Sequence, residues 1–216
     1  KFLCPGENVK VSMPLEVQAL LDQASVQART ASAPFVSNIC DSPWDRFIEQ
    51  WAGRCYTFVA QALGPYHKEP LRTILPLDDG MHSAGANASF EPATGQIRLS
   101  PSVVDGHPGI TLEKLTHELI HASLNDFPEG DPFFEEGYVD YSTWVMAHAP
   151  AWGQYRNAMI DAAAFNIACR KDRAMKALSE YDAKRWAGGT FCASAYGPWI
   201  VTKLSLKKRE GNLSWV

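Results

Sequence analysis

The sequence predicts an α+β fold, in which strands and helices in the first part of the chain are followed by a helical last part. Residues 71–77 and 86–100 read as strands, and the second segment contains a turn sequence typical of a hairpin. After residue 131, apolar side chains recur almost throughout at helical spacing. Strands grouped ahead of a run of helices are typical of α+β proteins, whereas α/β proteins alternate the two.

Length and composition indicate a globular protein with one sizeable core. The chain has 216 residues, of which 46% are hydrophobic. This suffices for one compact unit of two lobes, which we expect at 1–126 and 127–216. The net charge of −4 provides no basic surface for nucleic acid, and no apolar run reaches the roughly 18 residues that a membrane span needs. We therefore expect neither a nucleic-acid partner nor a membrane span, and we take the chain to be a monomer.

The elements start and stop at recognisable signals. Helices are expected at 14–30 and 42–63, the second opened by Asp-Ser-Pro at 41–43. The sequence Pro-Ala-Thr-Gly at 92–95 is expected to form the turn of the 86–100 hairpin. Asp131 followed by Pro132 indicates the start of the next helix. The helices expected in the last part are 132–147, 152–167, 171–185 and 198–209.

The segment between the hairpin and Asp131 carries the most informative motif. A helix is expected to begin after Thr111 as its N-cap and to stop at Asn125. Its core-facing stripe consists of Leu112, Leu115, Leu119 and Ala122, with Ile120 at the margin. Away from that stripe lie His117 and His121, which belong to the run His-Glu-Leu-Ile-His, a match to H-E-x-x-H. Two histidines four residues apart can bind one zinc ion, and Glu118 between them can take a proton from water that the metal activates.

A catalytic zinc ion normally has a third protein ligand, which must lie downstream. The glycine and the third histidine of a metzincin are replaced by Leu124 and Phe127, and the aspartate of an aspzincin by Ala193. A glutamate on the next helix remains. Glu136 and Asp140 are four residues apart and share a face of that helix, so we predict Glu136 as the ligand. Asp140 then accepts the other N–H of a ligating histidine, whereas Glu135 points elsewhere and is accounted for by the helix dipole.

The pair of motifs H-E-L-I-H and E-x-x-x-D resembles the gluzincins, the thermolysin-like and aminopeptidase-like zinc peptidases. The resemblance covers roughly residues 85 to 200 and is strong at 117–121 and 136–140. It implies a two-lobed domain, with a small mixed or antiparallel sheet and the active-site helix in one lobe and a mostly helical second lobe. It also implies one catalytic Zn²⁺ and a peptide or protein substrate.

Two further site residues are implied by this resemblance. Asn87 and Ala88, with Asn87 30 residues before His117, correspond to an edge strand that binds the substrate main chain. Tyr196, 60 residues after Glu136, corresponds to a tyrosine that donates a hydrogen bond to the oxyanion.

Several alternatives stay open at this point. Asn-Ala-Ser at 87–89 is also a loop sequence or a glycosylation acceptor, and Tyr155 and Tyr181 are rivals of Tyr196. The sequence at 85–89 lacks the glutamate with which aminopeptidases bind the substrate amine, which favours an endopeptidase over an aminopeptidase. A module of another class, in which zinc only stabilises a binding surface, is disfavoured by Glu118, because a structural site needs no general base.

The five cysteines give information about the compartment of the protein rather than about the reaction it catalyses. No C-x-x-C pair is present, so none of them indicates a structural zinc site. Cys169 can pair with Cys192, and Cys4 with Cys40 or Cys55, which would leave one cysteine free. Disulfides favour a secreted or otherwise extracytoplasmic protein, with reduced buried thiols as the alternative.

Overall fold

The computed structural model describes residues 15–30, 34–39, 43–78, 87–104, 107–124 and 132–165. Its elements are α1 (Leu15–Arg29), β1 (Val36–Ser37), α2 (Pro43–Leu63), β2 (Thr73–Pro76), β3 (Ala88–Glu91), β4 (Gln96–Leu99), α4 (Pro101–Val104), α5 (Pro108–Ser123), α6 (Pro132–Ala147) and the 3₁₀ helix η1 (Pro150–Tyr155). A further helical segment spans 156–165. Helices therefore accompany one small sheet, which confirms the α+β class.

The four strands form a mixed sheet in the order β1-β2-β4-β3. The pairs β1–β2 and β2–β4 are parallel, and β3 is antiparallel to β4. The predicted hairpin is confirmed, with Phe90 opposite Ile97 and a turn at 92–95. Gly95 in this turn has φ +79°, and a Cβ there would lie 2.7 Å from the carbonyl oxygen of Glu69. The two-residue strand β1 was not predicted, because it is too short to show alternation.

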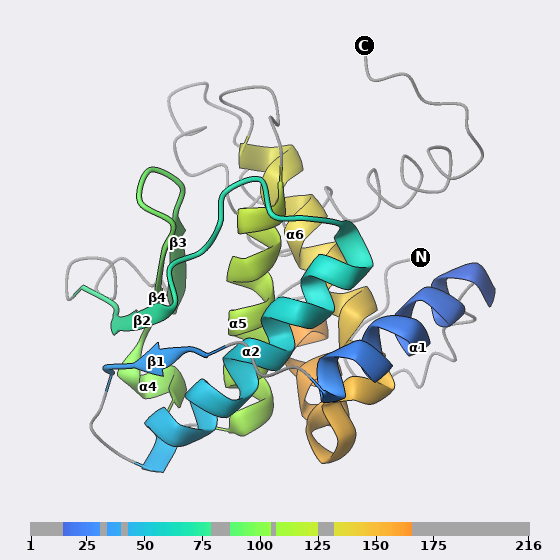
Figure 1. The fold of residues 1–216 in the computed structure, drawn as a ribbon, viewed down its shortest axis with the longest axis horizontal. Helices are drawn as coiled ribbons and strands as arrows, with labels where there is room; N and C mark the ends of the chain where they lie inside the picture. Colours follow the sequence, from blue (N-terminus) through green and yellow to red (C-terminus); the bar gives the residue numbers. More distant parts are fainter. Residues whose placement is uncertain are drawn as a thin grey trace, which may run out of the picture.

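Helix α5 is the centre of the fold. It packs on β3 and β4, on the helices α2 and α4, and on α6, and Figure 1 shows the sheet on one side of α5 and α6 on the other. The predicted stripe is confirmed, since Leu112, Leu115, Leu119, Ile120 and Ala122 are all fully buried. The polar face is buried as well, since His117 and Glu118 are among the buried residues of this helix.

The predicted start of α5 was wrong. The helix begins at Pro108 with His107 as its N-cap, and the Nδ1 atom of His107 accepts a hydrogen bond from the backbone N–H of Gly109. Proline favours the first helical position, where no N–H is needed. Thr111 lies inside the helix, where its hydroxyl donates to the carbonyl oxygen of Val103. The helix ends at Ser123, two residues before Asn125.

The other helices agree well with their predicted bounds. The prediction for 132–147 is confirmed by α6, and those for 14–30 and 42–63 by α1 and α2 to within a residue. The segment predicted as a helix at 152–167 instead opens as η1, with a non-helical Gly153 at φ +54°, before the helix at 156–165. The predictions for 171–185 and 198–209 lie outside the described residues.

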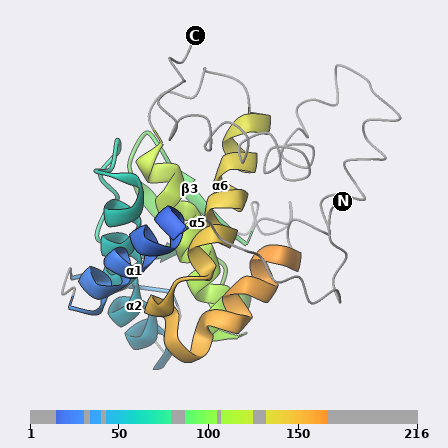
Figure 2. The same cartoon turned by 90° about the vertical axis from the view of Figure 1, so that its right-hand side faces the viewer.

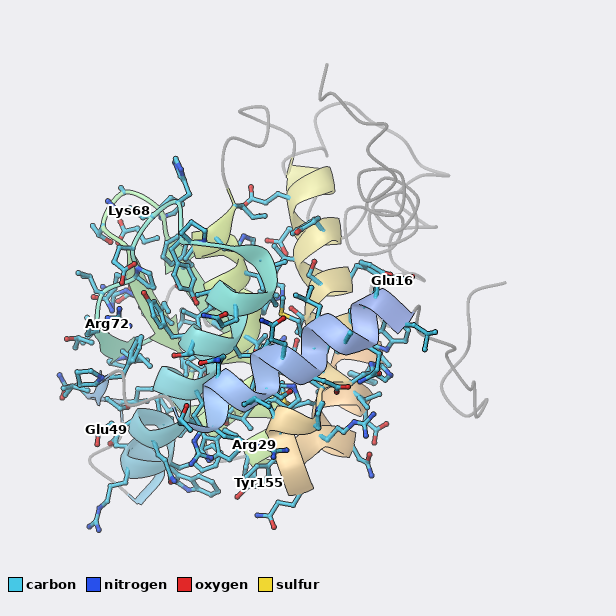
Figure 3. All side chains as sticks on the ribbon, turned by 45° about the vertical axis from the view of Figure 1, so that its right-hand side comes forward. Glu16, Arg29, Glu49, Lys68, Arg72 and Tyr155 are labelled. Carbon is cyan, nitrogen blue, oxygen red and sulfur yellow. The ribbon has the colours of Figure 1, made fainter. Side chains whose placement is uncertain are left out.

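The packing of the helices closes one core. Helix α1 packs on α2 and on η1, and the guanidinium of Arg29 donates to the carbonyl oxygen of Pro150. Figure 3 shows Arg29 and Tyr155 near one end of α1 and Glu16 near the other end. Figure 2 shows α6 beside α5. Within the described residues no helix is both long and apolar enough to cross a membrane.

Among the described residues the only cysteine is Cys55, which is a free and fully buried thiol on α2. The alternative pairing of Cys4 with Cys55 is therefore not found. Burial raises the pKa of the Cys55 thiol to about 12, although a hydrogen bond with Thr116 lowers it in part. The other cysteines, Cys4, Cys40, Cys169 and Cys192, lie outside the described residues.

This burial predicts that Cys55 resists alkylation in the folded protein. A pKa raised from 9.0 to about 12 lowers the thiolate fraction at pH 8 by about a thousandfold, because each pKa unit is a factor of ten. Iodoacetamide labelling at pH 8, followed by mass spectrometry of the peptide that contains Cys55, checks this. We expect labelling only after unfolding in guanidinium, and rapid labelling of the native protein would contradict the burial.

Candidate metal centre

Helices α5 and α6 bring together three side chains that can hold a metal ion. The Nε2 atoms of His117 and His121 are 3.3 Å apart. Glu136 lies 3.6 Å from Nε2 of His117 through Oε2 and 3.5 Å from Nε2 of His121 through Oε1. A tetrahedral ion with bonds of about 2.0–2.1 Å places its ligand atoms about 3.3 Å apart. The three predicted ligands thus form a triangle of the size that such an ion needs.

The antiparallel packing of α5 on α6 produces this triangle. His117, the earlier histidine on α5, faces Asp140, the later acid on α6, through an Nδ1–Oδ1 distance of 3.3 Å. His121, the later histidine, faces Glu135, the earlier acid, through an Nδ1–Oε1 distance of 2.8 Å. Glu136 lies between them and faces both rings. Each histidine therefore has a carboxylate behind it and turns its Nε2 toward the other.

The position of Glu135 corrects the sequence analysis. Glu135 was assigned to the helix dipole, but its carboxylate is hydrogen-bonded to Nδ1 of His121. A carboxylate at Nδ1 fixes the ring orientation and leaves Nε2 as the lone-pair donor. The Asp140–His117 contact has the predicted partners, and its geometry is that of an ion pair rather than of an aligned hydrogen bond. The signal in the sequence that could have predicted this contact is the separation of 14 residues between His121 and Glu135, which suits two antiparallel helices joined by a short connection.

The carboxylates of the cluster outnumber its histidines, so the cluster is stabilised by a positive charge. Burial lowers the pKa of His117, but its contacts with Asp140 and Glu136 outweigh this and raise the pKa to about 10. Burial also lowers the pKa of His121, and its hydrogen bond with Glu135 raises it above the usual value. For Glu136, burial raises the pKa, and the two histidines lower it to a net decrease. Protons on the histidines or a bound cation can both neutralise this surplus of carboxylates.

Glu118 lies between the two histidines in sequence and is buried, as His117 is. Burial raises the pKa of its carboxyl, while the charges of His117 and His121 lower it. Within the described residues its carboxylate makes no hydrogen bond or ion pair to another side chain. It is a proton acceptor beside the ligand triangle that is not itself part of the triangle.

The cluster is not sealed from solvent. The side chains of His121 and Glu136 are 12% and 20% exposed, whereas those of His117 and Asp140 are 7% and 3% exposed. The accessible side of the triangle is therefore that of His121 and Glu136. A small molecule could reach an ion held there, as an open fourth coordination position requires.

The predicted substrate-binding pair lies at an edge of the sheet. Ala88 is the first residue of β3, the strand at the end of the order β1-β2-β4-β3, and Asn87 precedes it with an exposed side chain. The carbonyl oxygen of Asn87 accepts from the N–H of Ser100, so the hairpin pairing extends to this residue. Strand β3 also packs on α5, which places the edge strand beside the helix of the metal ligands.

The predicted oxyanion donor, Tyr196, lies outside the described residues, as does its rival Tyr181. The other rival, Tyr155, belongs to η1, and its ring packs edge-on against Phe47 and Trp51 at centroid distances of 5.5 and 5.4 Å. This aromatic packing accounts for Tyr155 as a core residue. It gives no support to Tyr155 as an oxyanion donor.

A separate hollow of about 540 Å³ lies where β2 and β4 end and α4 begins. Its lining comprises Pro76, Leu77, Asp78, Arg98, Ser100, Pro101 and Ser102. None of the predicted site residues is among them, and Arg98, which is partly buried, faces the exposed Asp78 there at 3.7 Å as an ion pair. The hollow and the ligand triangle are therefore distinct features.

Comparison of the chain with models of protein families, with curated proteins and with solved structures found no match. The functional conclusions below therefore depend on the geometry and chemistry of the cluster.

The contact between Glu135 and His121 predicts an order of metal affinities. Glu135→Ala should weaken Zn²⁺ binding by about 10- to 100-fold, because it removes the group that orients a ligand. Glu136→Ala should weaken binding further, since it removes a ligand itself. Competition with a chromophoric chelator measures both. Glu16→Ala, at an exposed glutamate on α1, is the control and should bind Zn²⁺ as the wild type does. Wild-type Zn²⁺ affinity in Glu135→Ala would mean that Glu135 does not orient His121 and interacts only with the helix dipole.

Proposed function

We propose that this protein is a zinc-dependent peptidase. The observation that supports this most directly is the triangle of His117, His121 and Glu136, with ligand separations of 3.3 to 3.6 Å, beside the free carboxylate of Glu118. Two imidazoles and one carboxylate are a common ligand set of catalytic zinc, and the remaining position is left to water and substrate.

The same features argue against a purely structural metal. Structural zinc sites are usually closed by four protein ligands, often cysteines. Here three ligands converge on a partly exposed point, and the only described cysteine, Cys55, is held in the core by α2. A buried acid next to the ligands also has no structural purpose, because an uncompensated carboxylate is costly to bury. A role in proton transfer explains why Glu118 lies there.

The proposed reaction assigns each residue one task. When bound, zinc acts as a Lewis acid that polarises the scissile carbonyl and makes water more acidic. Glu118 takes a proton from the attacking water and delivers it to the leaving amine nitrogen. Asp140 and Glu135 keep the imidazoles of His117 and His121 oriented toward the ion. Tyr196 is proposed to donate its hydroxyl hydrogen to the developing oxyanion.

An extended peptide is the proposed substrate, bound along β3. Because β3 is the last strand in the sheet order, one side of its backbone is free to pair with a further strand within the described residues. Pairing of this kind holds the substrate main chain whatever its side chains. Together with the lack of a glutamate at 85–89, this favours an endopeptidase. The proposed cleft runs between a lobe that contains the sheet and α5 and a lobe that begins with α6.

Removal of the general base tests the proposed function. Glu118→Gln should retain Zn²⁺ and lower kcat for a quenched peptide library by about 10² to 10⁴-fold, because proton transfer in the transition state is lost. The measurement combines initial rates with metal analysis of the dialysed protein. Glu16→Gln on α1, at a distance from the sheet (Figure 3), should keep the wild-type rate.

Two further treatments complete this test. 1,10-Phenanthroline should abolish cleavage, and added Zn²⁺ should restore it. Peptides with a blocked N-terminus should be cleaved as well as free ones, whereas a requirement for a free amine would indicate an aminopeptidase. A wild-type kcat in Glu118→Gln would contradict the proposed mechanism.

A further inference from the structure

The connection between α2 and β2 contacts both of the elements that the proposed reaction uses. It spans residues 64–72, and Figure 1 shows it running from the end of α2 to β2, alongside the β3–β4 hairpin. Within it, residues 68–71 touch the end of α5 and also the turn of the hairpin. Connections between elements usually lie on the surface and vary in position. A connection that is bonded on two sides therefore does more than join α2 to β2.

The backbone of Lys68 binds the end of α5 that carries the metal ligands. Its N–H donates to the carbonyl oxygen of Ala122 at 3.0 Å, and Ala122 directly follows His121. The last four carbonyl groups of an α-helix have no partner within the helix, and in α5 (Pro108–Ser123) Ala122 supplies one of them. The bond therefore fixes the 68–71 segment to the last turn of α5, to which His121 belongs.

The same segment holds the turn of the hairpin. The N–H of Leu71 donates to the carbonyl oxygen of Gly95 at 2.8 Å, and Nζ of Lys68 donates to that of Ala93 at 3.2 Å. Gly95 is buried, and a Cβ there would lie 2.7 Å from the carbonyl oxygen of Glu69 and 3.5 Å from Cε of Lys68. The segment and the turn are thus in direct contact, with no room for a side chain between them.

Aromatic side chains fix the connection to α2 as well. The hydroxyl of Tyr56, on α2, donates to the carboxylate of Glu69 at 2.9 Å, and Arg72 pairs with the same carboxylate at 2.6 Å. The rings of Tyr56 and Tyr66 stack at a centroid distance of 4.5 Å, and the hydroxyl of Tyr66 donates to the carbonyl oxygen of Tyr56. The 68–71 segment is therefore held from a third side and cannot simply follow a displacement of the hairpin.

We propose that the 68–71 segment, with Lys68 as its positioning residue, fixes the β3–β4 hairpin relative to the turn of α5 that carries His121. This inference rests on the proposed function, because it concerns where a peptide bound along β3 meets the metal ligands. Apolar packing of β3 on α5 is non-directional, whereas the hydrogen bonds of the segment to both elements fix a distance and a direction. Misplacement of a reacting group by about 1 Å can cost about 100-fold in rate.

Gly95→Ala separates the turn from the segment. The added Cβ must move away from the carbonyl oxygen of Glu69, since 2.7 Å is far inside ordinary van der Waals contact. For a blocked octapeptide long enough to lie along β3, kcat should fall by about 10- to 100-fold with KM unchanged, because the peptide still pairs with β3 but meets the ligands out of place. Zn²⁺ affinity should not change, because the ligands lie on α5 and α6.

Gly64→Ala is the matched control. Gly64 also has a positive φ, +101° against +79° at Gly95, but a Cβ there meets no described atom within 4 Å. This variant carries the backbone strain without the displacement, and it should keep the wild-type kcat.

Lys68→Met is a second variant, at a partly exposed side chain where folding is not at risk. It removes the bond from Nζ to Ala93 and keeps the backbone bond to Ala122. We expect kcat to fall by about 2- to 10-fold, the net effect of one hydrogen bond. Lys68→Arg retains a long cationic donor and should recover most of the loss.

Hydrogen exchange followed by mass spectrometry provides a readout that does not need turnover. In Gly95→Ala, peptides that cover β3 and β4 should exchange about 2- to 10-fold faster, as expected for loss of a bond such as that from Leu71 to Gly95. Peptides from α1 should exchange as in the wild type, and Gly64→Ala should leave the hairpin unchanged. A wild type that cleaves no peptide would refute the proposed function, and the exchange rates would still decide whether the segment fixes the hairpin.

Three results would overturn the inference. The first is wild-type kcat, or wild-type exchange of the hairpin, in Gly95→Ala. The second is an equal fall of kcat in Gly64→Ala, or a fall in Gly95→Ala that accompanies an equal loss of zinc affinity or of folded protein by circular dichroism, which would make the contact purely structural. The third is a Lys68→Met variant with wild-type kcat, or the absence of any recovery with Lys68→Arg.

Discussion

The packing of α5 against α6 is the constraint on which the site depends. Neither helix carries a complete ligand set, because α5 supplies the histidines and α6 supplies the carboxylates. The antiparallel pairing of His117 with Asp140 and of His121 with Glu135 aims both Nε2 atoms at one point and brings Glu136 to the third corner. A slide of one helix by a single turn, about 5.4 Å, would separate all of these partners.

The rest of the fold fixes the position of α5. Its leucine stripe is fully buried, and it is enclosed by the sheet, α2, α4 and α6. Protein interiors are close-packed, so a helix enclosed in this way cannot shift without opening voids. The surplus of carboxylates at the α5–α6 contact would repel without a cation, and so the charge of the cluster and the packing of its helices depend on each other.

Much of this could be predicted from the sequence, because strong local signals were present. The 3.6-residue period fixed the stripe of α5, and Pro132 marked the start of α6. The ligands followed from helical spacing within each segment. What the sequence could not show depends on contacts between segments: Glu135 was misassigned because its partner lies on another helix. The N-cap His107 was missed because histidine is an uncommon cap, and β1 because two residues carry no period.

The central claim is that two histidines and one glutamate hold one zinc ion. X-ray absorption at the zinc edge of the purified, zinc-loaded protein tests it most directly. The account predicts one ion per chain, with a first shell of nitrogen and oxygen only at about 2.0–2.1 Å and the outer-shell scattering of two imidazoles. His117→Ala should remove one imidazole from that signal. A sulfur shell at about 2.3 Å, or a protein that retains no zinc, would contradict the account.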